Sequence, residues 1–236
     1  MKKLLLTMLL VFVVHTADSQ VLIALLFGDA LNTGKVEFGL DGGFNWSTLR
    51  GVPGAKTLPI WNLGFYFDIK LADTTWMFHT GVIVKSTMGT KNSPLYGLGD
   101  HNLDSSFTGG SVTTTLNYFN VPLMLKYRFP NNIYLEGGGM LGIMYGATDE
   151  FVNSVHEEDD LTFDRNVKSA YHPLDAGLMV GAGYRLLGGN GINLGIRYYY
   201  GLVDVYIDDS SPAQYNRAIY LTVGIPIGAA EHASQP

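Results

Sequence analysis

Residues 191–202 read GINLGIRYYYGL, and two kinds of side chain alternate along this stretch. The even-numbered positions from Ile192 to Leu202 are all apolar or aromatic, whereas the odd-numbered positions hold glycine, asparagine, arginine and Tyr199. Successive side chains of a β-strand point to opposite faces, so a period of two is typical of a strand that separates two environments. The stretch therefore predicts a β-strand with one apolar face and one polar face.

The same alternation recurs in seven other segments of the chain. They are residues 35–47, 61–71, 76–85, 116–129, 133–146, 174–185 and 215–227. Each run covers about 11 to 14 residues, against roughly 5 or 6 for a typical strand in a soluble protein, and is long enough to cross a bilayer at a tilt. We therefore expect eight strands that span a membrane.

The links between these segments alternate between short and long. The short links are residues 72–73, 130–132 and 187–190, and the long links are residues 50–57, 89–111, 148–171 and 205–214. Outer-membrane barrels have short periplasmic turns and longer external loops, so the asymmetry favours such a barrel. An even number of strands then places both chain ends in the periplasm of a Gram-negative bacterium.

Alternation alone does not say which face meets water, because a soluble β-sandwich has the same pattern with its apolar face inward. Strand length and unequal links favour the membrane, and so does glycine on the polar face, where a small barrel has least room. Aromatic residues near the strand ends predict girdles at headgroup depth; they are Trp46, Trp61, Trp76, Tyr145, Tyr184, Tyr200 and Tyr215. We predict an all-β fold, an eight-stranded antiparallel up-and-down transmembrane β-barrel with a short N-terminal periplasmic segment.

The N-terminus has the pattern of an export signal. Lys2 and Lys3 precede an apolar run over residues 4–14, and the small residues Ala17 and Ser19 suit cleavage before Gln20. The run is too short to span a membrane as a helix, which takes about 20 apolar residues. We expect a signal peptide at residues 1–19, a helical or unstructured periplasmic segment at 20–34, the barrel at 35–229 and a polar tail at 230–236.

Composition narrows the classes of partner and chemistry. The 236 residues include 29 Gly, 14 Tyr and 12 Phe, and only 15% are charged. The net charge is −6, and the 15 basic residues are scattered, so a nucleic-acid-binding patch is not expected. The chain has no cysteine, which excludes disulfides, thiolate metal sites and a thiol nucleophile.

Four stretches carry a family resemblance: residues 21–29 (VLIALLFGD), 39–47 (GLDGGFNWS), 116–127 (LNYFNVPLMLKY) and 191–198 (GINLGIRY). In these the chain resembles the PorT-like outer-membrane β-barrel proteins of Bacteroidetes-type bacteria. The resemblance implies an eight-stranded barrel and, because the best-known member works with a secretion machinery, envelope or secretion-complex proteins as candidate partners. It transfers no site residue. One departure is the last strand, which ends in IPIG at residues 225–228 and a polar tail rather than in an aromatic residue.

The polar faces of the predicted strands gather charges of both signs. We predict a lumen charge network of Glu37, Asp41, Asp68, Lys70, Lys85, Lys126, Arg128, Glu136, Asp175, Arg185 and Arg197. Side chains fill the interior of an eight-stranded barrel, so these groups are expected to pair and to close the lumen. The alternative is a narrow channel for small solutes, lined by the same residues.

No pattern in the chain predicts an enzyme. His79, His101, His156 and His172 have acidic residues nearby in sequence, but their spacing identifies no nucleophile or base. The acidic run at residues 156–160 either binds a divalent cation, which would bridge to lipopolysaccharide, or is a solvated loop, and no calcium-loop spacing supports the first. We expect a structural or partner-binding role in the outer membrane, with lipid and lipopolysaccharide as surroundings, no metal site and no cofactor.

Overall fold

The computed structural model describes residues 34–71, 75–154, 156, 161–189, 191–208 and 211–227. The predicted signal peptide, the polar tail, most of the acidic run and all of the segment at 20–34 except Gly34 lie outside these residues. No helix in the described part of the chain is long and apolar enough to span a membrane.

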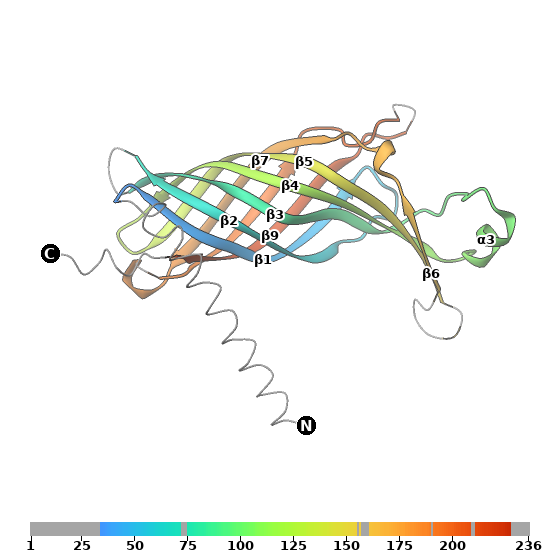
Figure 1. Ribbon diagram of the computed structural model, residues 1–236, viewed down its shortest axis with the longest axis horizontal. Coiled ribbons are helices and arrows are strands. Elements are labelled where there is room, and N and C mark those ends of the chain that lie inside the picture. Colours follow the sequence, from blue (N-terminus) through green and yellow to red (C-terminus); the bar gives the residue numbers. More distant parts are fainter. Residues whose placement is uncertain are drawn as a thin grey trace, which may run out of the picture.

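Eight long strands form one closed antiparallel ring, as the sequence predicts. They are β1 (Val36–Arg50), β2 (Leu58–Lys70), β3 (Trp76–Ser93), β4 (Ser111–Arg128), β5 (Ile133–Asn153), β7 (Leu174–Arg185), β8 (Asn193–Gly201) and β9 (Tyr215–Pro226). Each strand pairs with the next one along the chain, and β1 pairs with β9 to close the ring (Figure 1). The topology is that of an up-and-down barrel.

The apolar side chains of the strands lie on the outside of the ring. Leu174, Val180 and Ile196 are 61%, 57% and 55% exposed, whereas Tyr199 and Tyr220, on the other face, are fully buried. A soluble sandwich would bury the first set, so an outward apolar belt fits a barrel surrounded by lipid. In residues 191–202 the apolar face therefore points outward and the other face points into the barrel.

Aromatic side chains mark the two edges of this belt. Trp46, Trp61 and Tyr200 are exposed near the end that carries the long loops. Trp76 and Tyr184 are exposed near the end that carries the short turns. Amphipathic rings settle at headgroup depth, so the two sets define the thickness of the membrane-facing belt.

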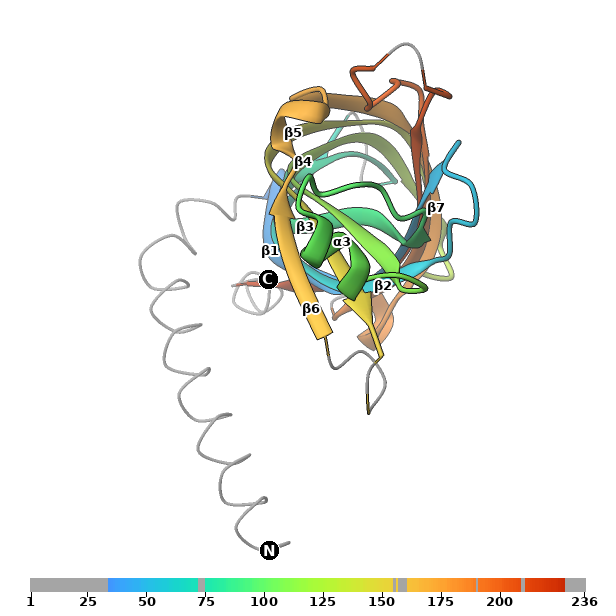
Figure 2. The same ribbon diagram turned by 90° about the vertical axis from the view of Figure 1, so that its right-hand side faces the viewer.

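Two of the segments expected to be loops contain further regular structure. Residues 148–171 include β6 (Leu161–Asn166), which pairs with the C-terminal end of β5. Residues 89–111 include the last residues of β3 and the helix α3 (His101–Ser106). Both project beyond the barrel at one end (Figure 1), and Figure 2 views the ring from that end.

A small apolar cluster explains why these loops fold. Phe107, Val112 and Phe151 are buried together, and Leu98, Leu103 and Leu161 pack against them. These residues come from three segments that meet only in the folded chain, so no local sequence pattern announces the cluster. The Asp100 side chain caps α3 by accepting hydrogen bonds from the backbone N–H groups of Asn102 and Leu103, at 2.9 and 3.2 Å.

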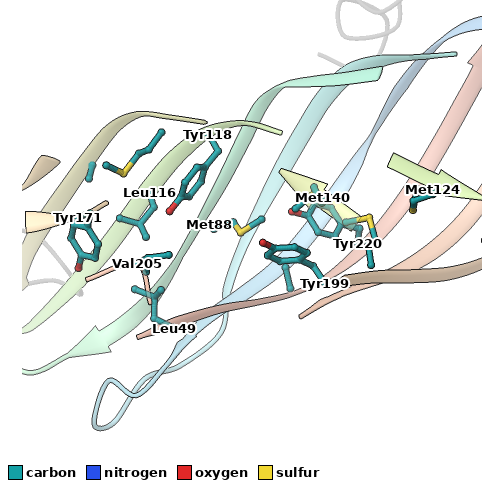
Figure 3. Close-up of a cluster of buried hydrophobic side chains, with 14 residues drawn as sticks. Leu49, Met88, Leu116, Tyr118, Met124, Met140, Tyr171, Tyr199, Val205 and Tyr220 are labelled. Carbon is teal, nitrogen blue, oxygen red and sulfur yellow. The ribbon is translucent and has the colours of Figure 1, made fainter. Parts of the chain in front are cut away.

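The barrel interior has two layers. Toward the long loops it is filled by methionine and tyrosine side chains, among them Met88, Tyr118, Met140, Tyr199 and Tyr220 (Figure 3). Toward the short turns it holds charged groups. Buried side chains make up both layers, as is usual for the interior of an eight-stranded barrel.

Candidate functional site: the lumen charge network

The inner faces of three strands carry four carboxylates, and the inner faces of three other strands carry their cationic partners. The carboxylates are Glu37 and Asp41 on β1, Asp68 on β2 and Glu136 on β5; the cations are Lys126 on β4, Arg185 on β7 and Arg197 on β8. Every second side chain of each strand points into the barrel, and this brings together groups that lie up to 156 positions apart in the sequence. Of the eleven residues predicted for the lumen, these seven are in contact with one another or with His79, and we reserve the name lumen charge network for these seven and His79.

Arg197 lies at the centre of the network. Its guanidinium donates from Nη1 to Asp41 Oδ2 at 2.9 Å and from Nε to Glu136 Oε1 at 2.5 Å, and its side chain is only 4% exposed. β7 runs between Glu136 and Arg197, and Gly181 is the residue paired with both. A Cβ there would lie 2.9 Å from Arg197 Cγ and 3.0 Å from Glu136 Oε1, so glycine leaves the room that this ion pair needs.

Asp68 holds the second part of the network. It accepts a hydrogen bond from Lys126 Nζ at 2.8 Å and lies 2.6 Å from His79 Nδ1. His79 Nε2 is 3.0 Å from Arg197 Nη2, and an arginine nitrogen can only donate. The Nε2 atom is therefore the acceptor in this contact, and the His79 ring links Asp68 to Arg197.

Glu37 and Arg185 form a bidentate pair nearest the short turns. Arg185 donates from Nη1 and Nη2 to the two Glu37 oxygens at 2.8 and 2.7 Å. Tyr66 Oη donates to Glu37 at 3.0 Å and accepts from Asn193 Nδ2 at 3.2 Å. The Tyr66 ring stacks on His79, with centroids 5.7 Å apart, so this pair is in contact with the rest of the network.

Lys85 was predicted to be in the lumen, and the structure corrects this. Its Nζ lies 3.5 Å from the centroid of the Trp61 ring on the outside of the barrel. The cause is a bulge: the β3–β4 register shifts between Ile83 and Ser86, so the inward and outward positions exchange along β3. A strict period of two cannot reveal such an inserted residue.

Three other predicted members are separate from the network. Lys70 donates to the Gly34 carbonyl at the exposed rim. Arg128 donates to the Gly189 carbonyl at 3.3 Å and to Met77 Sδ at 3.1 Å, both near the short turns. Asp175 is buried in the layer of methionine and tyrosine, where it accepts from Asn216 Nδ2 at 2.8 Å. These three side chains face inward or lie at the rim, but at other heights along the barrel.

Sequence reasoning did not single out His79, Tyr66 and Tyr134 as parts of this site. Lys126 Nζ lies 4.3 Å from the centroid of the Tyr134 ring, a cation–π contact that complements its ion pair. The available signal was the position of His79 in the alternation, two residues from Met77 and two from Gly81, which predicts an inward side chain. Alternation cannot show which inward groups lie at the same level along the barrel axis, because that depends on the register between strands.

The network leaves almost no free space. The cavity bordered by Asp41, Tyr66, His79, Lys126 and Arg197 has a volume of about 10 Å³. A single water needs about 10 to 15 Å³, so a substrate does not fit. Among the described residues, no group of three or more His, Asp or Glu side chains is arranged to hold a metal ion. The arrangement links strands across the inside of the barrel.

A family profile agrees with this architecture. The profile of the outer membrane protein beta-barrel domain matches residues 24–206. Solved structures that match include Ail of Yersinia pestis, with 14% identity over 81% of this chain and 99% of that chain and a TM-score of 0.42. Neisserial surface protein A matches with 9% identity over 81% and 96% and a TM-score of 0.40, and OprG of Pseudomonas aeruginosa with 14% identity over 81% and 93% and a TM-score of 0.35.

No curated protein matches the sequence. The profile, however, covers well over half of the chain, and the closed ring with its outward apolar belt is the architecture that the profile describes. The chain therefore belongs to the outer membrane protein beta-barrel domain family, and its place is the bacterial outer membrane.

Proposed function

We propose that this barrel has a structural or partner-binding role in the envelope and does not pass solutes. The observation that carries the proposal is the lumen charge network, which cross-links strands β1, β2, β4, β5, β7 and β8 and leaves a cavity of about 10 Å³. Buried ion pairs resist separation, because each partner left alone would be an uncompensated charge in a medium of low dielectric constant. A lumen closed in this way leaves the loops as the part that acts.

The loops at the long-loop end form an organised surface, which supports a binding role. A pocket of about 480 Å³ opens at the mouth and is bordered by Tyr96, Asp149, Arg165, Tyr171 and Tyr206. Tyr96 Oη donates to Asp149 Oδ2 at 2.7 Å, and Thr114 Oγ1 donates to Asp149 Oδ1 at 2.6 Å. Burial and this contact with Asp149 raise the pKa of the Tyr96 phenol well above its usual range, so it remains a donor at neutral pH.

The orientation and the identity of the partner are parts of the same proposal. The long loops would face the outside and both chain ends the periplasm, in keeping with the usual asymmetry of outer-membrane barrels. The PorT-like resemblance of residues 116–127 and 191–198 makes a protein of a secretion complex the candidate partner. We assign no catalytic role to the chain.

Permeability is the direct test of the closed lumen. Vesicles that contain the full chain are expected to swell in small sugars and amino acids no faster than vesicles without protein, and planar bilayers are expected to show no unitary current steps. The reason is that the cavity within the lumen charge network is only about 10 Å³, and buried methionine and tyrosine side chains occupy the other layer. A general porin in the same vesicles provides the positive control. Swelling that slows as solute size increases would instead establish the narrow channel.

Labelling of introduced cysteines tests the orientation, and the absence of native cysteine makes the background low. Ser105, on α3, and Asn131, in a short turn, are exposed at opposite ends of the barrel. In intact cells, a membrane-impermeant maleimide is expected to label the Ser105→Cys variant and to leave the Asn131→Cys variant unlabelled. Permeabilising the outer membrane should then allow the second variant to react. The reverse pattern would overturn the orientation.

A further inference from the structure

A groove of about 730 Å³ lies on the outside of the barrel near the long-loop end, across β1, β8 and β9. One wall is apolar and aromatic and includes Trp46, Tyr198 and Ile219. Two cations, Arg50 and Arg217, also line the groove, and no Asp or Glu does. Two arginines without a carboxylate beside them are unusual on the outer face of a membrane barrel, where most side chains are apolar and face lipid.

Arg217 is held rigidly in this groove. It points outward, between the inward Asn216 and Ala218, yet it is only 9% exposed. Its guanidinium carbon lies 3.5 Å from the centroid of the Tyr200 ring, and Nη1 donates to the carbonyls of Gly201 and Asn216 at 2.7 and 2.8 Å. The structure records no acceptor for Nε and Nη2 among the described residues. These two donors form the planar pair that recognises two oxygens of a phosphate or carboxylate.

Arg50 provides a second cation beside the first. In the β1–β9 ladder, Thr48 pairs with Arg217 and Arg50 pairs with Tyr215, so Arg50 lies two residues farther toward the loops on the same outward face. Arg50 is exposed, and the Arg217 guanidinium also lies 5.7 Å from the Tyr215 ring. The two positive charges are therefore neighbours on adjacent strands.

The depth of the groove indicates which part of a lipid would meet these charges. Trp46 and Tyr198 both pair with Ile219, two residues closer to the barrel centre than Arg217. Exposed Trp and Tyr rings mark the boundary between headgroups and acyl chains, so the arginines, which lie farther toward the loops, are level with the lipid headgroups. The groove thus combines anion recognition with a slot for hydrocarbon.

We infer that this groove binds the phosphorylated headgroup of lipopolysaccharide, with the lipid A phosphate against Arg217 and Arg50 and an acyl chain along Trp46 and Ile219. Lipopolysaccharide phosphates lie at this depth in the outer leaflet. Because the Tyr200 ring already holds the Arg217 guanidinium in place, binding costs less side-chain conformational entropy. The inference rests on the proposed orientation, with the long loops outside, and does not depend on whether the lumen is closed.

Lys85 offers a matched control. It too is an outward cation on an aromatic ring, at 3.5 Å from the Trp61 centroid, but it does not line the groove and has no second cation paired beside it. Replacing it removes one positive charge from the lipid-facing surface and leaves the groove intact.

The test is lipid binding to the purified full chain in detergent micelles, followed by native mass spectrometry. The probes are diphosphorylated lipid A, the same lipid A without phosphates, and phosphatidylglycerol. The wild-type chain is expected to bind the phosphorylated lipid A roughly tenfold more tightly than the dephosphorylated form, and the R50Q/R217Q variant should lose about that factor. The K85Q variant should bind as the wild type does, and the R50Q single variant, changed only at an exposed side chain, should show part of the loss.

Three results would overturn the inference. One is equal binding of phosphorylated and dephosphorylated lipid A by the wild type. Another is an equal loss in K85Q and R50Q/R217Q, which would mean that only total charge matters. The third is equal competition by phosphatidylglycerol, which would assign the groove to phospholipid. A gel shift between unheated and boiled protein shows whether each variant is folded. Because the assay uses micelles, it stays separate from the permeability test of the closed lumen.

Discussion

Replacing Arg197 by alanine is expected to cost about 3 to 5 kcal/mol of the free energy of unfolding, the usual penalty when one partner of a buried charge pair is removed. Arg197 serves Asp41 and Glu136 together and contacts His79 through Nη2. Without it, two buried carboxylates would face each other with no cation between them. The loss should therefore exceed the value of any single hydrogen bond, roughly 0.5 to 1.5 kcal/mol.

Urea unfolding in lipid vesicles, followed by tryptophan fluorescence, measures this loss. The Lys85→Ala variant removes a cation from the outer surface and should change the unfolding free energy by no more than about 1 kcal/mol. A triple variant, with Arg197→Met, Asp41→Asn and Glu136→Gln, should recover most of the stability, because no buried charge is left alone. If Arg197→Ala and Lys85→Ala were equally mild, the network would not be holding the barrel closed.

The Gly183→Val variant is expected to fail to form a closed barrel. A Cβ at Gly183 would lie 2.2 Å from Tyr134 Oη and 2.3 Å from the Leu194 carbonyl oxygen, and the latter is backbone of the neighbouring strand. Tyr134 is buried and donates to the same carbonyl at 3.2 Å, so it has no space into which to retreat. Overpacking of this kind costs about 1 to 3 kcal/mol for ordinary cores, and more where backbone must move.

Gly137 provides the matched control for this substitution. It lies on β5, next to the inward Glu136 in sequence, and its Cβ would meet nothing closer than 3.9 Å. The Gly137→Val variant should stay within about 0.5 kcal/mol of the wild type, as outward substitutions generally do. The readout is the fraction that migrates as compact barrel on unheated gels after refolding. Equal yields of the two variants would show that the interior yields more easily than the packing implies.

The lipid-facing groove and the lumen charge network divide the arginines of the barrel between two tasks. Arg197 and Arg185 meet carboxylates inside, where their charges are neutralised. Arg217 contacts an aromatic ring and two backbone carbonyls on the outside, where no carboxylate neutralises its charge. Arginine thus pairs with carboxylates where it points inward and contacts aromatic and backbone groups where it points outward.

The alternation of apolar and polar residues along the sequence determined the fold class. The alternation in residues 191–202 set which side chains face out, and the structure has Ile196 exposed and Tyr199 buried as that pattern requires. Link lengths set the up-and-down topology, and tryptophan positions set the edges of the belt. These features are readable because a strand imposes a period of two on neighbouring residues, whatever the rest of the chain does.

The tertiary structure alone decided which charges meet. Asp41 and Arg197 pair because β1 and β8 both flank β9 in the closed ring, and Glu136 reaches Arg197 because Gly181 lies between them. Lys85 leaves the lumen because one bulge inserts a residue into β3, and β6 and α3 form because aromatic residues from separate loops meet. Register, bulges and ring closure are relations between strands, so a period read along one strand cannot contain them.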